Sequence, residues 1–272
     1  MLDRFSCYEL CVQSPRHVVA LLRAVHGHEP VLLREDFCGT AAVSRRWCAE
    51  GNKRDDGSRA NAIDLDPDVI SRARQEAQRE QASVGLALHV GDATSKDAPA
   101  AAAPADVIFV GNFSIGYLHR RAELMRYLRH SHARLKKANA GFGGGIFACD
   151  IYGGANAFRL GSVERKHPGR AGEVIHYVWS HERADPMTGM VENRIRFRVE
   201  RDGEIVQEIP DAFTYHWRLW SLAELREAME EVGFSGVEVY KDANVAPGQA
   251  VEPVTDPADL GEDWVVLVVG RA

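Results

Sequence analysis

Short apolar runs alternate with amphipathic stretches along the first 150 residues. The apolar runs predict strands at 31–33, 60–64, 86–90, 107–110 and 146–149. Helices are predicted around them, from capping residues and from apolar positions at helical spacing, over 14–27, 40–48, 66–80 and 120–137. Strands that alternate with helices in this way predict a parallel sheet with helices on both faces. Thr40 is expected to cap the second helix, and 51–59 and 95–105 are expected to be loops.

The pattern changes after residue 150. A stretch rich in glycine and polar residues precedes three longer β-like runs, at 173–183, 190–200 and 204–215. In the middle run Ile195, Phe197 and Val199 alternate with arginines, and this period of two predicts a sheet with one buried face. We interpret 151–216 as an antiparallel insertion. A helix from Ser221 to Gly233 and two strands, at 237–240 and 264–269, then close the chain, the strands pairing at one sheet edge.

The expected organisation is therefore an N-terminal lid helix and the first, ligand-binding part of the main domain at 1–150, the insertion at 151–216, and the last part of the main domain at 217–272. The insertion is expected to form a substrate lid or the surface of a homodimer.

Bulk properties narrow the class of protein. The 272 residues carry a formal net charge of -6, which counts against nucleic acid as a partner. The five cysteines contain no C-x-x-C pair, and no set of ligands has the spacing of a metal site. Neither a targeting segment nor an apolar run long enough to span a bilayer is evident, so we expect a cytoplasmic protein with no membrane partner.

The stretch LLREDFCGTAA, at 32–42, has the character of a strand, a tight turn and a helix start. Ligands of parallel α/β sheets bind beyond the carboxyl ends of the strands, so this junction is the first candidate site. Its acids, Glu35 and Asp36, would repel a diphosphate and would tolerate a cationic ligand. Asp64 and Asp92 follow the second and third strands. Each acid alone also fits a solvated strand end, but the three positions together favour a ligand site.

These motifs resemble those of class I S-adenosylmethionine-dependent methyltransferases. LLREDFCGTA is similar to the family's acidic, glycine-rich loop, AIDLDPDVISRAR to its second-strand acid and helix, HVGDAT to its third-strand motif, and GFSGVEVY with DWVVLVVGR to its closing hairpin. The resemblance covers about residues 30–150 and 217–272. It implies an α/β fold, with a doubly wound, mostly parallel, seven-stranded Rossmann-like sheet and the antiparallel insertion, and S-adenosylmethionine as cofactor.

The resemblance also implies roles for individual residues. Glu35 would lie near the methionyl ammonium, Gly39 at the close backbone approach, Asp64 on the ribose and Asp92 beside the adenine. Phe37 and Ala41 stand where the family usually has glycine. The expected cofactor-binding set comprises the loop residues, the acids with their neighbours, and a segment on either side: Tyr8, Glu35, Phe37, Cys38, Gly39, Thr40, Asp64, Leu65, Asp92, Ala93, Asn112 and Phe113.

The segment GNFSIGYLHR, at 111–120, is similar to one in small-molecule N-methyltransferases, including those acting on amino sugars, where a histidine occupies the position of Tyr117. Catalytic candidates are Tyr117, His119 and His176. Substrate candidates are Tyr152, Arg196, Tyr215 and Trp217, with Asp150 as a further acceptor contact. Pocket-shaping residues, a half-buried strand and a solvated arginine face are the alternative interpretations of these positions.

The leading hypothesis is methyl transfer from S-adenosylmethionine to a small organic acceptor. Such an in-line displacement depends mainly on positioning, and it requires a general base only where the acceptor must lose a proton. A protein or RNA methyltransferase, a non-catalytic S-adenosylmethionine-binding protein and a nicotinamide-dependent oxidoreductase remain alternatives.

Overall fold

A computed structural model describes residues 2–98, 103–139, 143–241 and 249–272. The chain forms two compact units. The larger contains 15–154 and 220–272, and the smaller contains 1–14 and 155–219. The N-terminal segment thus groups with the insertion, whereas the sequence had suggested that it groups with the cofactor-binding part. The predicted loop at 95–105 lies partly outside the described residues.

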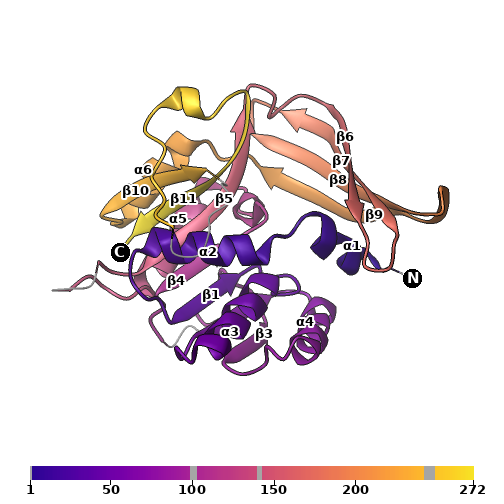
Figure 1. The fold of residues 1–272 in the computed structure, drawn as a ribbon. Coiled ribbons are helices and arrows are strands. Elements are labelled where there is room, and N and C mark those ends of the chain that lie inside the picture. The colour runs from indigo at the N-terminus through magenta and orange to yellow at the C-terminus, as the bar shows by residue number, and fades with distance from the viewer. Residues whose placement is uncertain (1, 99–102, 140–142, 242–248) are drawn as a thin grey trace. The chain divides into compact units, whose positions relative to one another are not determined.

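The larger unit is built on the predicted seven-stranded sheet (Figure 1). Its strands are β1 (Leu32–Asp36), β2 (Arg59–Asp64), β3 (Leu86–Val90), β4 (Val107–Val110), β5 (Ile146–Gly154), β10 (Gly236–Lys241) and β11 (Asp263–Arg271). They run in the order β10-β11-β5-β4-β1-β2-β3. β11 is antiparallel to both of its neighbours, and β1 to β5 pair in parallel. The doubly wound α/β sheet and its closing pair of strands are confirmed.

Helices cover both faces of this sheet. They are α2 (Pro15–His26), α3 (Ala42–Arg54), α4 (Pro67–Arg79), α5 (Arg121–Ala133) and α6 (Leu222–Val232), with short 3-10 turns η1 (Ser114–Tyr117) and η2 (Pro257–Asp259). α2 and α3 pack through Leu22 and Trp47 against one face of the sheet. α5 and α6 pack against the other face. The alternation of strand and helix along the chain therefore produces the two outer layers that the pattern predicts.

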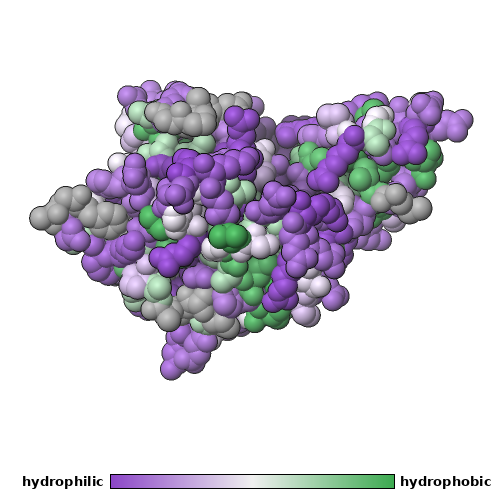
Figure 2. Space-filling model, turned by 60° about the horizontal axis from the view of Figure 1, so that its bottom comes forward, coloured by the Kyte–Doolittle hydropathy of each residue, from purple (hydrophilic) through white to green (hydrophobic). Residues whose placement is uncertain are grey.

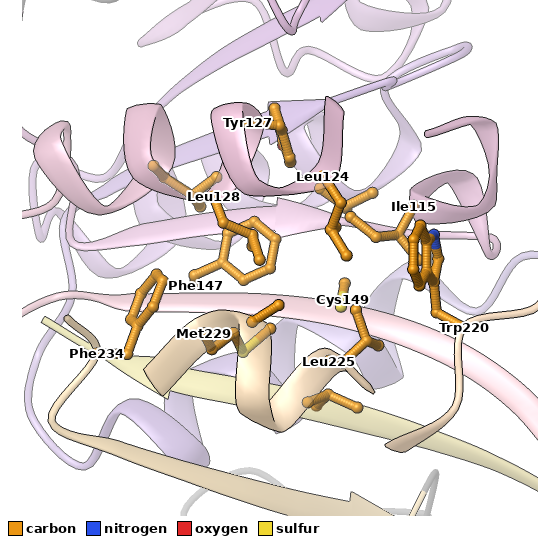
Figure 3. Close-up of a cluster of buried hydrophobic side chains, with 14 of the residues drawn as sticks. Ile115, Leu124, Tyr127, Leu128, Phe147, Cys149, Trp220, Leu225, Met229 and Phe234 are labelled. Carbon is orange, nitrogen blue, oxygen red and sulfur yellow. The ribbon is translucent and has the colours of Figure 1, made fainter. Parts of the chain in front are cut away.

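Figure 3 shows the core on the α5 and α6 face. Leu124 and Leu128 of α5 and Leu225 and Met229 of α6 converge on Phe147 of β5, and all five side chains are buried. Fully burying one such side chain stabilises a fold by about 1.5–3 kcal/mol relative to leaving it exposed. This cluster fixes β4 and β5 against the two helices, and hence fixes the ends of those strands.

Local signals explain most helix boundaries, with two exceptions. Asp66 caps α4 by accepting from the Asp68 amide at 2.8 Å, and Ser221 with Glu224 forms a capping box at α6. Thr40 was expected to cap α3, but Ala41 is the residue before the helix, in a left-handed conformation and without a side-chain cap. α3 also continues to Arg54, through part of the stretch 51–59 that was expected to be a loop.

The smaller unit is a four-stranded antiparallel sheet with one helix (Figure 1). Its elements are α1 (Arg4–Cys11), β6 (Gly161–Pro168), β7 (Val174–Asp185), β8 (Met190–Arg201) and β9 (Glu204–Arg218), and the strand order is β6-β7-β8-β9. The apolar residues that alternate along β8 are buried in a cluster with Cys7 of α1, as the period of two predicts. Neither α1 nor the edge strand β6 was predicted from the sequence.

The face seen in Figure 2 is mostly hydrophilic, with apolar residues in separate groups. Within the described residues, no helix has the length and apolar character needed to cross a membrane.

A buried ion network lies where β1 meets α5. Asp36 is fully buried and accepts from Arg34 Nε at 2.7 Å, from the Tyr127 hydroxyl at 2.8 Å and from Arg134 Nη2 at 3.4 Å. Burial, and then the Asp36 carboxylate, raise the pKa of Tyr127 well above its usual value, so the hydroxyl remains a donor. The network fixes the last residue of β1.

Replacing Tyr127 by phenylalanine should lower the free energy of unfolding by about 1.5–3 kcal/mol, because a buried carboxylate loses a donor. Denaturant unfolding of the two proteins measures the difference. Tyr240→Phe is the matched control, since the Tyr240 hydroxyl bonds at 3.0 Å to the partly exposed carboxylate of Glu238. The control should lose about 1 kcal/mol or less. Equal losses in the two variants would contradict a special role for the Asp36 network.

Candidate functional site

The loop after β1 has a glycine-like backbone at three alternate positions. Phe37, Gly39 and Ala41 have φ angles of 56°, 53° and 54°. The two positions where the resembling family usually has glycine therefore keep the conformation that glycine adopts freely. A left-handed backbone costs an ordinary residue roughly 1–2 kcal/mol, so the loop stores strain. Strain of this kind is concentrated at functional sites in proteins.

Asp64, at the end of β2, holds this loop. Its Oδ2 accepts from the Gly39 amide at 2.8 Å, and its Oδ1 accepts from the Asp66 amide at 3.1 Å. An ionised carboxylate has about four acceptor positions, so two remain for a ligand. A Cβ built on Gly39 would meet no atom within 4 Å, which means that the space beside this glycine is open. The geometry suits close approach of a ligand that carries hydroxyl donors.

Glu35 and Asp36 were expected to act together on the ligand, and this expectation is corrected by the structure. Successive side chains of a strand point to opposite faces. Asp36 therefore lies on the α5 face, within the ion network, and its charge is compensated there. Only Glu35 faces α3, where its Oε2 accepts from the Ser44 amide at 2.8 Å.

Glu35 has an unusual protonation equilibrium. The residue is only 5% exposed, and burial raises the pKa of its carboxyl to about 7, although the bonds from Ser44 oppose the shift. At neutral pH the protonated and ionised forms are thus both populated. A cation placed nearby would favour the ionised form.

Phe37 stacks between two tyrosines. Its ring centroid is 6.4 Å from that of Tyr117, with nearly parallel planes at 22°, and 5.9 Å from that of Tyr127, edge to face at 69°. The ring thus links the strained loop to η1 and to the buried ion network. Tyr117 is 43% exposed.

The remaining cofactor candidates of the larger unit differ in how much of their side chains is exposed. Leu65 is 66% exposed directly after Asp64. Cys38, Thr40 and Ala93 are buried, so they would offer a ligand mainly backbone groups. Asp92 is exposed, and its Oδ1 holds the following turn by accepting the amide and hydroxyl of Thr94 at 2.8 Å and 2.7 Å.

A second strained turn follows β4. Asn112 and Phe113 have φ angles of 54° and 61°, and their amides donate to the two oxygens of Asp150 at 2.9 Å and 2.6 Å. The Phe113 ring packs edge to face on Tyr152, with centroids 4.9 Å apart. Sequence reasoning placed Asp150 among the acceptor contacts and missed this structural role, although an acid at the end of a fifth strand continued the series. His119 lies just after η1 and is partly buried.

His176 and Arg196 lie in the smaller unit, within a network of charged side chains on the sheet face opposite the apolar cluster. The two ring nitrogens of His176 are 2.6 Å from Glu164 and 2.7 Å from Glu200. Arg196 donates to Ser180 at 2.7 Å and also binds Glu182. Both side chains are thus engaged in interactions within the sheet, which favours a structural role over base catalysis or substrate contact.

The aromatic candidates of the smaller unit lie on its apolar face. Tyr8 of α1 packs on Phe213, with centroids 4.9 Å apart. Tyr215 stacks on Trp217 at 4.2 Å, and Trp179 lies about 6 Å from both rings. The row is continuous along β9 from Phe213 through Tyr215 to Trp217, but Trp217 is only 2% exposed. In the part of the chain that is described, no cluster of three or more His, Cys, Asp and Glu side chains could bind a metal ion.

The chain has the fold of solved S-adenosylmethionine-dependent methyltransferases, with a seven-stranded sheet that ends in an antiparallel pair of strands. A methyltransferase of this kind from Clostridium acetobutylicum superposes with a TM-score of 0.65 at 15% identity, covering 97% of this chain and 95% of that one. DesVI of Streptomyces venezuelae gives 0.64 at 18% identity, covering 94% and 89%.

CalS10, an amino pentose methyltransferase from Micromonospora echinaspora determined with S-adenosylmethionine bound, gives a TM-score of 0.64 at 15% identity and covers 100% of this chain and 98% of that one. No family model matches the sequence, and no curated protein matches it either. At these identities, the likeness to solved structures establishes the fold.

Glu35→Gln should make stability less sensitive to pH. Between the ordinary pKa of 4.5 and the folded value of about 7, the folded state keeps a proton that the unfolded state has released. Raising the pH through this window therefore destabilises the wild type, by about 1.4 kcal/mol for each pKa unit. The variant should be the more stable protein at pH 8, and the difference in the free energy of unfolding between variant and wild type should vanish as the pH falls to about 4.5. Thermal unfolding across this range measures the effect, and a gap that does not change with pH would contradict a raised pKa.

Proposed function

We propose that this protein transfers a methyl group from S-adenosylmethionine to a small organic acceptor. One observation carries the choice of cofactor. In a loop that binds a pyrophosphate, backbone amides are free to donate to the phosphates. Here three loop amides already donate within the protein: Cys38 to Ile63 O at 3.0 Å, Gly39 to Asp64 at 2.8 Å, and Ala41 to Cys38 O at 2.8 Å. The loop therefore offers a diphosphate little, while the acids that surround it suit a nucleoside with positive charges.

Four residues of the larger unit would hold such a cofactor. Asp64 has acceptor positions left for the two ribose hydroxyls, and the exposed Leu65 beside it offers an apolar surface for the adenine. Asp92 would accept from the exocyclic amine. Glu35, within reach of the same loop, would favour the ammonium and the sulfonium by its charge. Gly39 leaves the space for this approach.

The cofactor, when bound, supplies an activated methyl group, and the protein's task is to align an acceptor with it. Tyr117, His119 and Tyr152 lie near the ends of β4 and β5 and are the candidates for this task in the larger unit. Tyr215 and Trp217 are candidates from the smaller unit. Tyr215 is partly exposed and suits a ring with an apolar face, whereas Trp217 is buried and would act by supporting the Tyr215 ring, on which it stacks. A role of the smaller unit as a lid or as the contact of a homodimer belongs to the same proposal.

Amino sugars and other small amines are the first acceptors to test, because a structural neighbour is an amino pentose methyltransferase. An amine that arrives unprotonated needs no strong base before transfer, which agrees with a site in which His119 is the candidate proton acceptor and the Tyr117 hydroxyl a candidate for orienting the amine. Methylation of protein or RNA, or binding without catalysis, would appear in the same assay as label on macromolecules or as no label.

Isothermal titration calorimetry tests the cofactor. S-adenosylmethionine and its demethylated product should both bind, and NAD should give no heat. Asp64→Ala should weaken binding at least tenfold, about 1.4 kcal/mol or more, because the ribose and the Gly39 amide lose their acceptor.

Asp66→Asn is the matched control for that variant. It lies two residues further along the chain, and its side chain caps α4. Asparagine caps a helix as well as aspartate does, so affinity should not change. Tight binding of NAD, or equal affinities of the Asp64 variant and the wild type, would overturn the proposed cofactor site.

A further inference from the structure

The turn at 111–114 is a tight, mirror-image β-turn. Both central residues, Asn112 and Phe113, have positive φ angles, and the Ser114 amide donates to Gly111 O at 3.2 Å. Asparagine suits the first central position of such a turn, whereas the second strongly favours glycine. A bulky aromatic residue at that second position is an outlier. Some other contact must therefore stabilise the turn.

Asp150 provides that contact. It lies on β5, which pairs with β4, and each of its oxygens accepts one amide of the two central residues. Charge-assisted bonds to backbone amides are among the stronger hydrogen bonds of proteins. The same strand carries Tyr152, against whose ring Phe113 packs. Two groups of β5 thus fix the backbone and the ring of Phe113.

The turn lies where the fold binds its ligands. β1 and β4 are neighbours, and the strand order runs away from this pair in both directions, to β2 and β3 on one side and to β5 on the other. Such a switch point places ligands at the carboxyl ends of the two central strands. The turn follows β4, the strained loop follows β1, and the stacked rings of Phe37 and Tyr117 connect the two segments.

We propose that Asp150 is a positioning residue that holds the Phe113 ring toward the sulfonium of the cofactor. This inference rests on the proposed function. An aromatic ring attracts a cation placed over its face, and the demethylated product has a neutral sulfur that lacks this attraction. Through Phe113, Asp150 would make the site prefer S-adenosylmethionine over S-adenosylhomocysteine, and it would favour release of the product after transfer.

Calorimetry with S-adenosylmethionine and S-adenosylhomocysteine measures this preference as a ratio of two dissociation constants. Phe113→Leu removes the aromatic ring and should reduce the preference roughly three- to thirtyfold, the range expected for a cation over a ring. Asp150→Asn turns one acceptor into a donor that faces an amide, so it should reduce the preference similarly and also lower the melting temperature. A loss of stability alone would leave the ratio unchanged.

Asp106→Asn is the matched control. Asp106 also binds two successive amides, those of Val31 and Leu32 at 3.1 Å and 2.8 Å, but it does so at the amino end of β1. This variant should lose stability and keep the ratio. In Asp150→Asn, adding Phe113→Gly should restore part of the melting temperature, because glycine adopts the turn freely, and should not restore the ratio.

The outcomes separate the two proposals. If the wild-type protein binds neither compound, the proposed function fails and this inference fails with it. If it binds both, and Asp150→Asn and Phe113→Leu keep the wild-type ratio, the role of Asp150 is refuted while the cofactor assignment stands. A reduced ratio in both variants, with an unchanged ratio in Asp106→Asn, supports the inference.

Discussion

The buried carboxylate of Asp36 determines how β1 ends and how the loop after it begins. Because it is fixed by Arg34, Tyr127 and Arg134, the last residue of β1 must face α5. Because successive side chains of a strand point to opposite faces, Glu35 then lies on the other face of the sheet, toward α3. The next residue, Phe37, must turn over Tyr127 and takes a left-handed backbone to do so. Breaking a buried ion pair by removing one partner typically costs about 3–5 kcal/mol, so this arrangement resists change.

Backbone strain is concentrated in the loops that follow β1 and β4. Seven non-glycine residues of the described chain have positive φ angles. Three of these, Asp55, Gln81 and Asp202, are polar and exposed, and they lie in surface turns at or near the end of a helix or strand. The other four are Phe37, Ala41, Asn112 and Phe113, and all follow β1 or β4. Within the described residues, apolar side chains therefore have this conformation only in the segments after β1 and β4. There Asp64 accepts the amide of Gly39, between Phe37 and Ala41, and Asp150 accepts the amides of Asn112 and Phe113. Strain at bulky or apolar residues is typical of functional sites, where it preorganises the groups that bind a ligand.

Much of this architecture can be predicted from the sequence, because buried parallel strands are short apolar runs and the insertion alternates with a period of two. The failures have physical reasons. β6 has the sequence GSVERKHP and is exposed at every position except His167, so it has no apolar pattern. Its pairing with β7 defines it as a strand. Thr40 has the chemistry of a cap, but the left-handed backbone at Ala41 moves the helix start by one residue. The different roles of Glu35 and Asp36 cannot be predicted from two adjacent acids. They depend on the partners of Asp36, Tyr127 in α5 and Arg134 just beyond it, which are 91 and 98 residues away along the chain.

Charge alone does not select the ligand at this site. With Asp36 compensated, Glu35 and Asp64 are the acids bonded to the start of α3 and to the loop, and a Glu35 pKa of about 7 means that its charge adapts to what binds. A diphosphate would need Glu35 to take up a proton, and near neutral pH this costs little free energy. The stronger selection is made by the backbone, because the amides of Cys38, Gly39 and Ala41 already have partners. A cationic ligand has both factors in its favour, since it needs no amide cradle and it favours the ionised Glu35. Its affinity must then rise with pH through about 7, because binding releases the proton that the free site holds.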